Sequence, residues 1–321
     1  MIVLWRVTTR CNYACGFCAY DRTIGGVRSD VAQAEAERFG TLLAEWGRAR
    51  SERVLLSWLG GEPLLWRPIL PLSASLARAG LAISATTNGS TLHRPDTRAA
   101  ILADFAELTI SIDGPAEVHD RLRGVPAAWR RARDGLRLLA AERRSAGSAL
   151  RLRANIVLMR DTVADFAALC GDLAEWGADE ITFNQLGGRD RPEFFPAQRL
   201  RPGDVAAFAQ TLLGLRDQLA TRGVRLCADP LYLRRLRASA VGEALPLNDC
   251  QLGRDFLFID EQGQIAPCSF SGREYGVPIA SLRTIAYIDG LHRRFAAARA
   301  TARCAACDDC PSTQAFAKFA A

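Results

Sequence analysis

Lysine is almost absent from this chain: of its 41 basic residues only Lys318 is a lysine, and the arginines are spread along the sequence. No dense basic stretch with interleaved aromatic residues is present, which disfavours a nucleic-acid partner despite the net charge of +6. The sequence also lacks an apolar run that approaches the ~18–20 residues needed to span a membrane. Its first residues lack the layout of a signal peptide. We therefore expect a cytoplasmic protein that binds neither nucleic acid nor membrane.

Histidine is also scarce, with three residues, whereas the chain has 10 cysteines. In a cytoplasmic protein so many cysteines need another explanation than disulfides. They fall into two groups, with only Cys170 and Cys227 standing alone. The first group is Cys11, Cys15 and Cys18, and the second is Cys250, Cys268, Cys304, Cys307 and Cys310.

Strand-like and helical patterns alternate six times before residue 223. The expected strands are 2–7, 54–59, 81–87, 108–113, 151–159 and 180–184, and the expected helices are 30–49, 67–80, 95–104, 127–146, 162–176 and 203–222. Such alternation predicts parallel strands joined by right-handed crossovers, in an open doubly wound sheet or an incomplete TIM-like barrel. We expect domains at 1–222 and 250–321, with 223–249 as a connector. A β-hairpin is expected over 256–268, turning at Gly263.

In both sheet architectures, function gathers at the carboxyl ends of the strands. The first cysteine group follows the first expected strand with the spacing CxxxCxxC. Three thiolates from one short loop can hold an iron–sulfur cluster and leave one iron open for a ligand. The alternative is a zinc-binding module. Zinc needs a fourth nearby ligand, and His93, His119 and His292 all lie outside this segment.

Further motifs follow the other expected strands. Phe17 precedes the last cysteine of the loop, and Gly60-Gly61-Glu62-Pro63 follows the second strand. Thr87-Asn88-Gly89 follows the third strand, and Ser111-Ile112-Asp113-Gly114-Pro115 with His119, Asp120 and Arg123 follows the fourth. Taken together with the cysteine spacing, these motifs resemble the radical S-adenosylmethionine (radical SAM) superfamily. The last stretch is similar to that of members with a C-terminal SPASM or twitch extension. The resemblance covers essentially the whole chain and implies an α/β fold, a partial (β/α)6 TIM-like barrel with a small Cys-rich extension.

The resemblance also implies residue roles. Cys11, Cys15 and Cys18 would hold a [4Fe–4S] cluster whose open iron binds the methionyl group of S-adenosylmethionine. Gly60, Gly61 and Glu62 would face the methionyl amine, and Arg123 its carboxylate, as a fork donor. Ser111 and the backbone of Tyr20 would lie near the nucleoside. Asn88 belongs to the same cofactor site.

The second cysteine group fits the start of the SPASM pattern and then departs from it. Five cysteines suffice for one four-thiolate auxiliary [4Fe–4S] cluster and not two, which resembles the shorter twitch variant. Cys250 and Cys268 would supply two ligands, and two of Cys304, Cys307 and Cys310 the others. The remaining thiol of that trio is either a hydrogen donor to a substrate radical or a spare.

Other polar residues near strand ends are candidates for substrate contact or for capping the following turn. They are Asp113, Asp120, Asn155, Asn184, Gln185, Arg189, Asp190 and Arg191. Cys170 lies in an apolar helical pattern and is expected in the core. The sequence does not distinguish between two positions for Cys227, in the core or near the site.

The resemblance implies reductive cleavage of S-adenosylmethionine to a 5′-deoxyadenosyl radical, which removes hydrogen from an unactivated C–H bond. We favour a polar small-molecule natural product as substrate, such as an aminosugar or nucleoside that is dehydrogenated or epimerised. The alternative is a ribosomally made precursor peptide that is crosslinked, epimerised or oxidised. A flavodoxin or ferredoxin is the expected electron donor.

Overall fold

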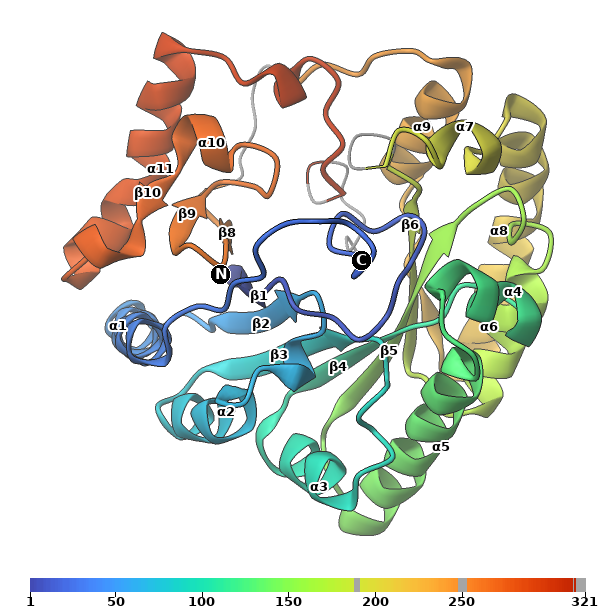
Figure 1. The fold of residues 1–321 in the computed structure, drawn as a ribbon, viewed down its shortest axis with the longest axis horizontal. Coiled ribbons are helices and arrows are strands. Elements are labelled where there is room, and N and C mark those ends of the chain that lie inside the picture. The colour runs from blue at the N-terminus through green and yellow to red at the C-terminus, as the bar shows by residue number, and fades with distance from the viewer. Residues whose placement is uncertain (188–190, 248–252, 314, 316–321) are drawn as a thin grey trace.

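Six parallel strands form the centre of the fold (Figure 1). The computed structural model describes residues 1–187, 191–247, 253–313 and 315. The strands are β1 (Ile2–Thr8), β2 (Leu55–Gly60), β3 (Ala82–Thr87), β4 (Glu107–Ser111), β5 (Arg151–Leu158) and β6 (Glu180–Gln185), and each pairs with the next in the chain. Helices on the outside bury the convex face of the sheet. The α/β partial barrel that the resemblance implies, one of the two architectures that the alternating pattern left open, is thus confirmed.

Six helices match the predicted positions: α1 (Gln33–Arg50), α2 (Ile69–Arg78), α3 (Pro95–Asp104), α5 (Ala128–Ala146), α6 (Phe166–Glu175) and α8 (Pro202–Thr221). Two short helices, η1 (Pro63–Leu65) and α7 (Phe195–Gln198), were not predicted. Trp5 of β1 and Trp58 of β2 are both fully buried and pack in the core with ring centroids 5.8 Å apart. An additional helix, α4 (Ala116–Arg123), was not expected. It lies directly after β4, at the site end of the barrel.

Residues 223–249, expected as a connector, contain regular structure. The short strand β7 (Arg225–Leu226) pairs in parallel with β6, and helix α9 (Pro230–Val241) follows it. Asp229 caps this helix, since its carboxylate accepts a hydrogen bond from the backbone N–H of Leu231 at 2.7 Å. The barrel sheet therefore continues one strand beyond the six predicted.

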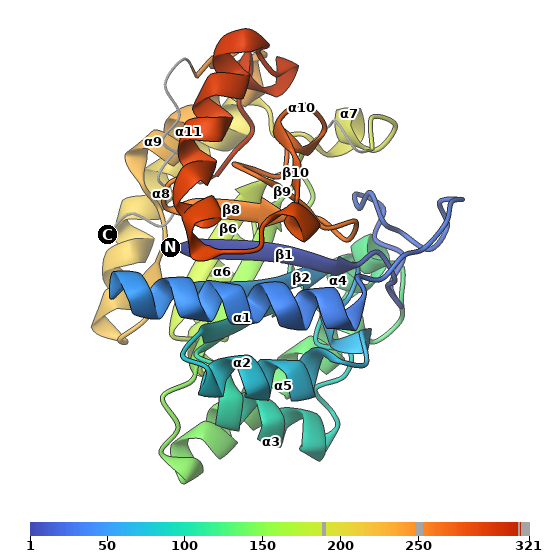
Figure 2. The ribbon, with the colours of Figure 1, turned by 90° about the vertical axis from the view of Figure 1, so that its left-hand side faces the viewer.

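The C-terminal extension joins the barrel's own sheet. Strand β8 (Phe256–Ile259) pairs in parallel with β1, beside which it lies in Figure 2, and the predicted hairpin to β9 (Gln264–Ala266) is confirmed. Gly263 has a φ of +75° in the hairpin turn, a conformation that favours glycine. The remaining elements are α10 (Gly272–Tyr275), β10 (Val277–Pro278), η2 (Ile279–Ser281), α11 (Ile285–Thr301) and η3 (Ala305–Cys307). The extension thus has a fixed position over the open side of the barrel.

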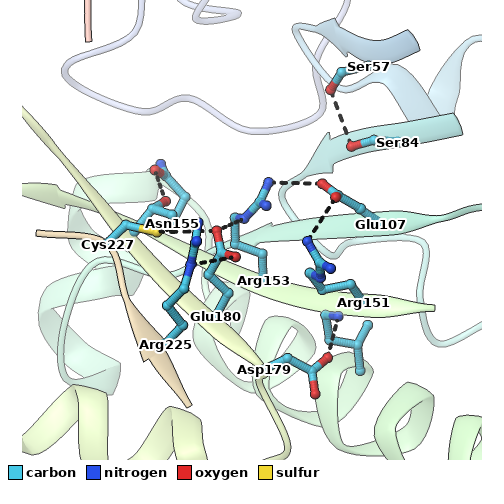
Figure 3. A network of polar contacts seen from close by, with 12 residues as sticks. Ser57, Ser84, Glu107, Arg151, Arg153, Asn155, Asp179, Glu180, Arg225 and Cys227 are labelled. Atoms are coloured by element: carbon cyan, nitrogen blue, oxygen red, sulfur yellow. Dashed lines mark hydrogen bonds and ion pairs between the residues drawn. The ribbon is translucent and has the colours of Figure 1, made fainter. Parts of the chain in front are cut away.

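A network of charged side chains crosses the amino-terminal ends of β4 to β7 (Figure 3). Arg153 lies 3.2 Å from Glu107 and 2.6 Å from Glu180, and Arg225 lies 3.3 Å from Glu180. The Cys227 thiol donates to Glu180 at 3.3 Å. Cys227 therefore lies at the end of the barrel opposite the predicted site, where it contributes to packing. Cys170 is fully buried in α6, as expected.

Candidate active site

The first three cysteines lie on the loop 9–32, between β1 and α1, at the carboxyl ends of the strands. Cys15 is buried and Cys11 and Cys18 are half-buried, and all three pack in one small apolar cluster with Tyr13 and Phe17. Burial, together with the nearby Glu62 and the other two thiols, raises the pKa of Cys11 to about 12. Thiolates at this position need a positive charge to stabilise them, which a bound metal cluster provides.

The spacing of these thiols bears on the kind of metal group that they fit. Across the described ranges, no three His, Cys, Asp or Glu side chains converge closely enough to hold a single metal ion. Tetrahedral zinc with ~2.3 Å bonds needs thiolates about 3.8 Å apart. In an iron–sulfur cubane each thiolate binds a different iron, so the ligands lie further apart. Three thiols in one apolar cluster, too far apart for a single ion, therefore fit an iron–sulfur cluster better than zinc.

The carboxyl end of α4 holds the cysteine loop in place. The backbone N–H groups of Ala14 and Gly16 donate to the carbonyls of Arg123 and Leu122, each at 3.1 Å. Gly124 ends the helix with a φ of +65°, and a Cβ there would lie closer than 3.0 Å to the carbonyl oxygen of Ala14. The glycine that follows Arg123 is a helix-terminating signal that the sequence analysis missed.

Arg123 contacts both the cysteine loop and the end of β4. Its Nε and Nη2 donate to Asp113 Oδ2 at 2.7 and 2.6 Å, and its Nη1 lies 3.8 Å from Cys15 Sγ. Asp113 is fully buried, and its Oδ1 accepts from the backbone N–H of Val157 at 2.9 Å. The fork that the resemblance assigns to a methionyl carboxylate is thus already bonded to a carboxylate of the protein.

His119 completes this buried group. Its Nδ1 accepts a hydrogen bond at 3.1 Å from the backbone N–H of Asp113. Burial, together with the charge of Arg123, lowers the pKa of His119 to about 4. The ring is therefore neutral at pH 7, with its proton on Nε2, which has no hydrogen-bond partner in the described part of the chain. His119 therefore contacts the site through the backbone N–H of Asp113.

The glycines after β2 pack against the start of the cysteine loop. The N–H of Gly61 donates to the carbonyl of Thr8, and that of Glu62 to the carbonyl of Arg10, both at 2.8 Å. A Cβ at Gly60 or Gly61 would lie closer than 3.0 Å to one of these two carbonyl oxygens. We expected these glycines to allow close approach of a ligand; the close approach that the structure contains is between two segments of backbone.

Glu62 joins the ends of β2 and β3. It is fully buried, and its carboxylate accepts from the Thr87 hydroxyl and the Asn88 N–H, each at 2.7 Å, and from the Leu64 N–H at 3.1 Å. Asn88 in turn donates to Asn12 at 3.0 Å and lies 3.8 Å from Cys11 Sγ. Burial raises the pKa of Glu62 to about 7. Predicted site residues from three motifs therefore form one connected group.

The polar residues at the ends of β4, β5 and β6 also meet. Asn155 Oδ1 accepts from the Thr182 hydroxyl at 2.9 Å and from Asn184 Nδ2 at 3.1 Å, and Ser111 pairs with Asn155 in the sheet. Asp120 lies elsewhere. Its carboxylate accepts from the backbone N–H groups of Ala127 and Trp129, at the start of α5. Of the two roles considered for Asp120, the structure shows capping.

Two further predicted residues connect the cysteine loop to its surroundings. The Tyr20 N–H donates to Cys18 Sγ at 3.4 Å, and the Arg6 guanidinium lies over the Tyr20 ring, 4.9 Å from its centroid. Arg191 donates to Asp21 at 3.0 Å and to the carbonyl of Cys18 at 3.3 Å, so it contacts the loop. Arg189 and Asp190 lie outside the described residues.

A cavity of about 850 Å³ lies between the strand ends and the C-terminal extension. Leu4, Asn184 and Gln185 line it from the barrel, and Cys268, Glu274 and Cys304 from the extension. The Cys304 thiol donates to Glu274 at 3.4 Å, and burial raises the pKa of Cys304 to about 11.

The other cysteines of the second group differ in position. Cys307 is half-buried and Cys310 is buried, and neither belongs to the described lining of this cavity. Cys250 lies outside the described residues. The structure thus brings Cys268 and Cys304 to one cavity that also contacts the predicted site.

Comparison with known proteins identifies a family profile and several similar proteins. The radical SAM superfamily profile matches residues 5–173. AdoMet-dependent heme synthase of Oleidesulfovibrio alaskensis is 26% identical over 84% of this chain and 69% of its own length. PqqA peptide cyclase of Xanthomonas campestris is 25% identical over 97% of this chain and 79% of its own.

A similar fold occurs in Streptococcus suis SuiB bound to its precursor peptide SuiA, with a TM-score of 0.68 at 15% identity. The match covers 93% of this chain and 66% of the SuiB chain. At this identity the likeness is one of fold. In the described part of the chain, no helix combines the length and apolarity that crossing a bilayer requires.

Proposed function

Because this chain belongs to the radical SAM superfamily, we propose that it is an enzyme that uses S-adenosylmethionine to modify a peptide substrate at an unactivated C–H bond. When bound, the [4Fe–4S] cluster and S-adenosylmethionine supply a 5′-deoxyadenosyl radical, a chemistry that side chains cannot perform. The observation that carries the proposal is the cavity of about 850 Å³ beside the cysteine loop. Its volume is in the range of ligand-binding sites.

Cys11, Cys15 and Cys18 would hold the cluster, with one iron left open. Around them, Gly60, Gly61, Glu62, Asn88 and the backbone of Tyr20 would hold the methionyl and adenine groups. Ser111 suits the nucleoside, because its hydroxyl makes no hydrogen bond within the described ranges while it lies at the end of β4. The residues of this chain orient the ligand and exclude water, so that the radical meets only its substrate.

An auxiliary [4Fe–4S] cluster would lie in a twitch-type extension. Cys268 and Cys304 support it, because both line the same cavity. Cys307 and Cys310 are both candidates for a further ligand, since the N–H of Leu247 donates to the Cys307 carbonyl at 2.9 Å and the N–H of Cys310 donates to the Leu245 carbonyl at 3.0 Å. Cys250 would be the fourth ligand. The thiol of the trio that is not a ligand would be the spare or the hydrogen donor.

The substrate proposal departs from the sequence analysis, which favoured a small polar natural product. Two of the similar proteins favour a peptide: the relative named PqqA peptide cyclase and SuiB with its precursor peptide. The cavity wall combines Phe195, Phe256 and Phe270 with the amides Asn184 and Gln185. Apolar side chains and backbone amides of a peptide segment suit such a wall better than a hydroxyl-rich sugar.

A small-molecule substrate is the second candidate, supported by a specific finding. Three relatives named AdoMet-dependent heme synthase match 84% of this chain at 24–26% identity. A tetrapyrrole or another small natural product therefore belongs in the test. The physiological electron donor proposed is a flavodoxin or ferredoxin.

The test reconstitutes the protein anaerobically, counts iron and sulfide, and measures 5′-deoxyadenosine after adding S-adenosylmethionine and dithionite. About eight irons per chain are expected for two four-iron clusters. Alanine at Cys11, Cys15 and Cys18 should remove about half of the iron and all nucleoside product. Absence of deoxyadenosine from the wild-type protein overturns the proposed activity, and about four irons overturns the auxiliary cluster.

Substrate class is then tested with two sets of probes. Synthetic copies of short peptides encoded beside the gene form one set, and a panel of aminoglycosides, nucleosides and porphyrins forms the other. We expect a peptide to increase deoxyadenosine formation and to change in mass. A change in mass confined to a member of the small-molecule panel overturns the peptide proposal and leaves the enzyme class intact.

A further inference from the structure

A buried arginine lies against one of the three thiols of the cysteine loop. Arg123 Nη1 is 3.8 Å from Cys15 Sγ, within hydrogen-bonding distance of a sulfur acceptor. The Arg123 side chain is 9% exposed, and its guanidinium lies 5.3 Å from the centroid of the Phe17 ring. Its positive charge is therefore weakly screened by water where it meets the sulfur.

A carboxylate fixes the orientation of this guanidinium. Arg123 Nε and Nη2 both donate to Asp113 Oδ2, whose side chain has no exposed surface. Asp113 makes two further hydrogen bonds that fix its position. Its carboxylate accepts from the backbone N–H of Val157, and its own backbone N–H donates to the His119 ring. The guanidinium thus has one geometry, with Nε and Nη2 toward Asp113 and Nη1 toward Cys15.

We infer that Arg123 and Asp113 together set the reduction potential of the cluster that Cys11, Cys15 and Cys18 would hold, with His119 as a positioning residue for Asp113. The inference rests on the proposed function, because it assumes that cluster. The reaction concerned is the one-electron reduction of the cluster from its 2+ to its 1+ state by an external one-electron donor. It transfers no proton and breaks no bond.

The physical reason is the charge that reduction adds beside Cys15. Arg123 stabilises the added negative charge and donates to a cluster sulfur, and hydrogen bonds to the sulfurs are among the factors that set the potentials of such clusters. Asp113 acts in the opposite direction, because its negative charge opposes reduction. The two residues therefore have effects of opposite sign on one measured quantity, although both belong to the same ion pair.

This role differs from the one that the resemblance implies for Arg123, namely binding the methionyl carboxylate. A residue that only binds S-adenosylmethionine changes the Kd of that ligand and leaves the potential of the ligand-free cluster unchanged. A residue that sets the potential changes it without S-adenosylmethionine present.

The experiment is a redox titration of the reconstituted full-length protein without S-adenosylmethionine, followed by electron paramagnetic resonance, with iron counted in each sample. The signal of the Cys11–Cys15–Cys18 cluster is identified by its loss in the triple alanine variant. Arg123→Gln should make the midpoint potential more negative, and Asp113→Asn should make it more positive. Arg123→Lys retains the charge and should remain closer to wild type than Arg123→Gln.

Arg98→Gln is the matched control. Arg98 is 6% exposed and ion-paired to Glu142 at 2.7 Å, between α3 and α5 on the outside of the barrel. Its substitution should leave the potential unchanged. Equal potentials in wild type, Arg123→Gln and Asp113→Asn, or shifts of the same sign in both variants, overturn the inference.

The failure of the proposed function has a different signature. It would appear as a wild-type protein without a cluster signal from the cysteine loop, which overturns both proposals at once. A normal cluster whose potential does not respond to the two substitutions overturns the inference alone. If Arg123→Gln weakens only S-adenosylmethionine binding, the role implied by the resemblance replaces the one proposed here.

Discussion

Gly61→Ala tests how the cysteine loop is positioned. Gly61 and Glu62 donate backbone hydrogen bonds to the carbonyls of Thr8 and Arg10, where the loop begins. A Cβ at Gly61 would lie closer than 3.0 Å to the carbonyl oxygen of Arg10, and backbone atoms of Thr9 are almost as near. Both sides of this contact are backbone, so no flexible side chain can move to relieve it.

The expected magnitude follows from these contacts. Displacing the loop weakens two hydrogen bonds, each contributing about 1 kcal/mol, and overpacking adds about 1–3 kcal/mol. Alanine also reduces the entropy of the unfolded chain, which offsets about 0.4–1 kcal/mol. We expect the free energy of unfolding to fall by about 3 kcal/mol. Because the loop carries Cys11, bound iron should fall as well.

The assay is urea unfolding of the apoprotein, with iron counted after reconstitution. Gly214→Ala is the matched control, because Gly214 lies inside α8 and a Cβ there meets nothing within 4 Å. This substitution should stabilise the protein by about 0.5–1 kcal/mol and leave the iron content unchanged. If Gly61→Ala unfolds like wild type and binds normal iron, the close approach does not position the loop.

Three further substitutions test other parts of the structure. Glu62→Gln tests the buried carboxylate. Burial raises the pKa of Glu62 from 4.5 to about 7. The contribution of protonated Glu62 to the stability of the wild-type protein is therefore fully present below pH 4.5 and is lost as pH rises through 7. The variant minus wild-type free energy of unfolding should therefore rise by about 3 kcal/mol between pH 4.5 and 7, and a difference independent of pH contradicts the shift. Asp120→Ala removes the acceptor for two N–H groups at the start of α5 and should cost about 1 kcal/mol in urea unfolding with unchanged iron; a loss of iron would place Asp120 in the site. Arg153→Gln leaves Glu107 and Glu180 buried without their shared cation and should cost about 3 kcal/mol, whereas a cost near zero would show that Arg151 and Arg225 suffice.

Much of the barrel follows from local patterns. Strands β1 and β2 are rich in apolar residues, and β5 alternates buried apolar residues with partly exposed ones. The helices carry an apolar stripe that packs on the sheet. The pattern located β1 to β6 and most helices to within a few residues. It missed α4, because Ala116–Arg123 contains five polar residues in eight and lacks a wide apolar stripe. Its buried residues His119 and Arg123 are held by polar contacts that involve Asp113.

For the predicted site, too, the local sequence identified some features, whereas others depended on residues far apart in the chain. The cysteine spacing and the residues after β2, β3 and β4 identified the loop and its neighbours, since residues at the ends of adjacent parallel strands meet at one edge of the sheet. Their partners were not predictable. Asn12 lies 76 residues before Asn88, and Arg123 lies 108 residues after Cys15, so no periodicity relates them. The predicted role of the two glycines likewise did not include their contact with Thr8 and Arg10.

The sequence by itself determined the alternation of strands and helices, the hairpin at Gly263 and the chemistry of the three thiols, because each depends on residues close together in the chain. Only the tertiary structure decided that β8 pairs with β1, which places Cys268 and Cys304 on a cavity shared with the barrel. It alone decided that Asp113 and Cys15 share one arginine. Pairing of distant segments depends on the burial and hydrogen bonding of the whole fold, and no local pattern encodes it.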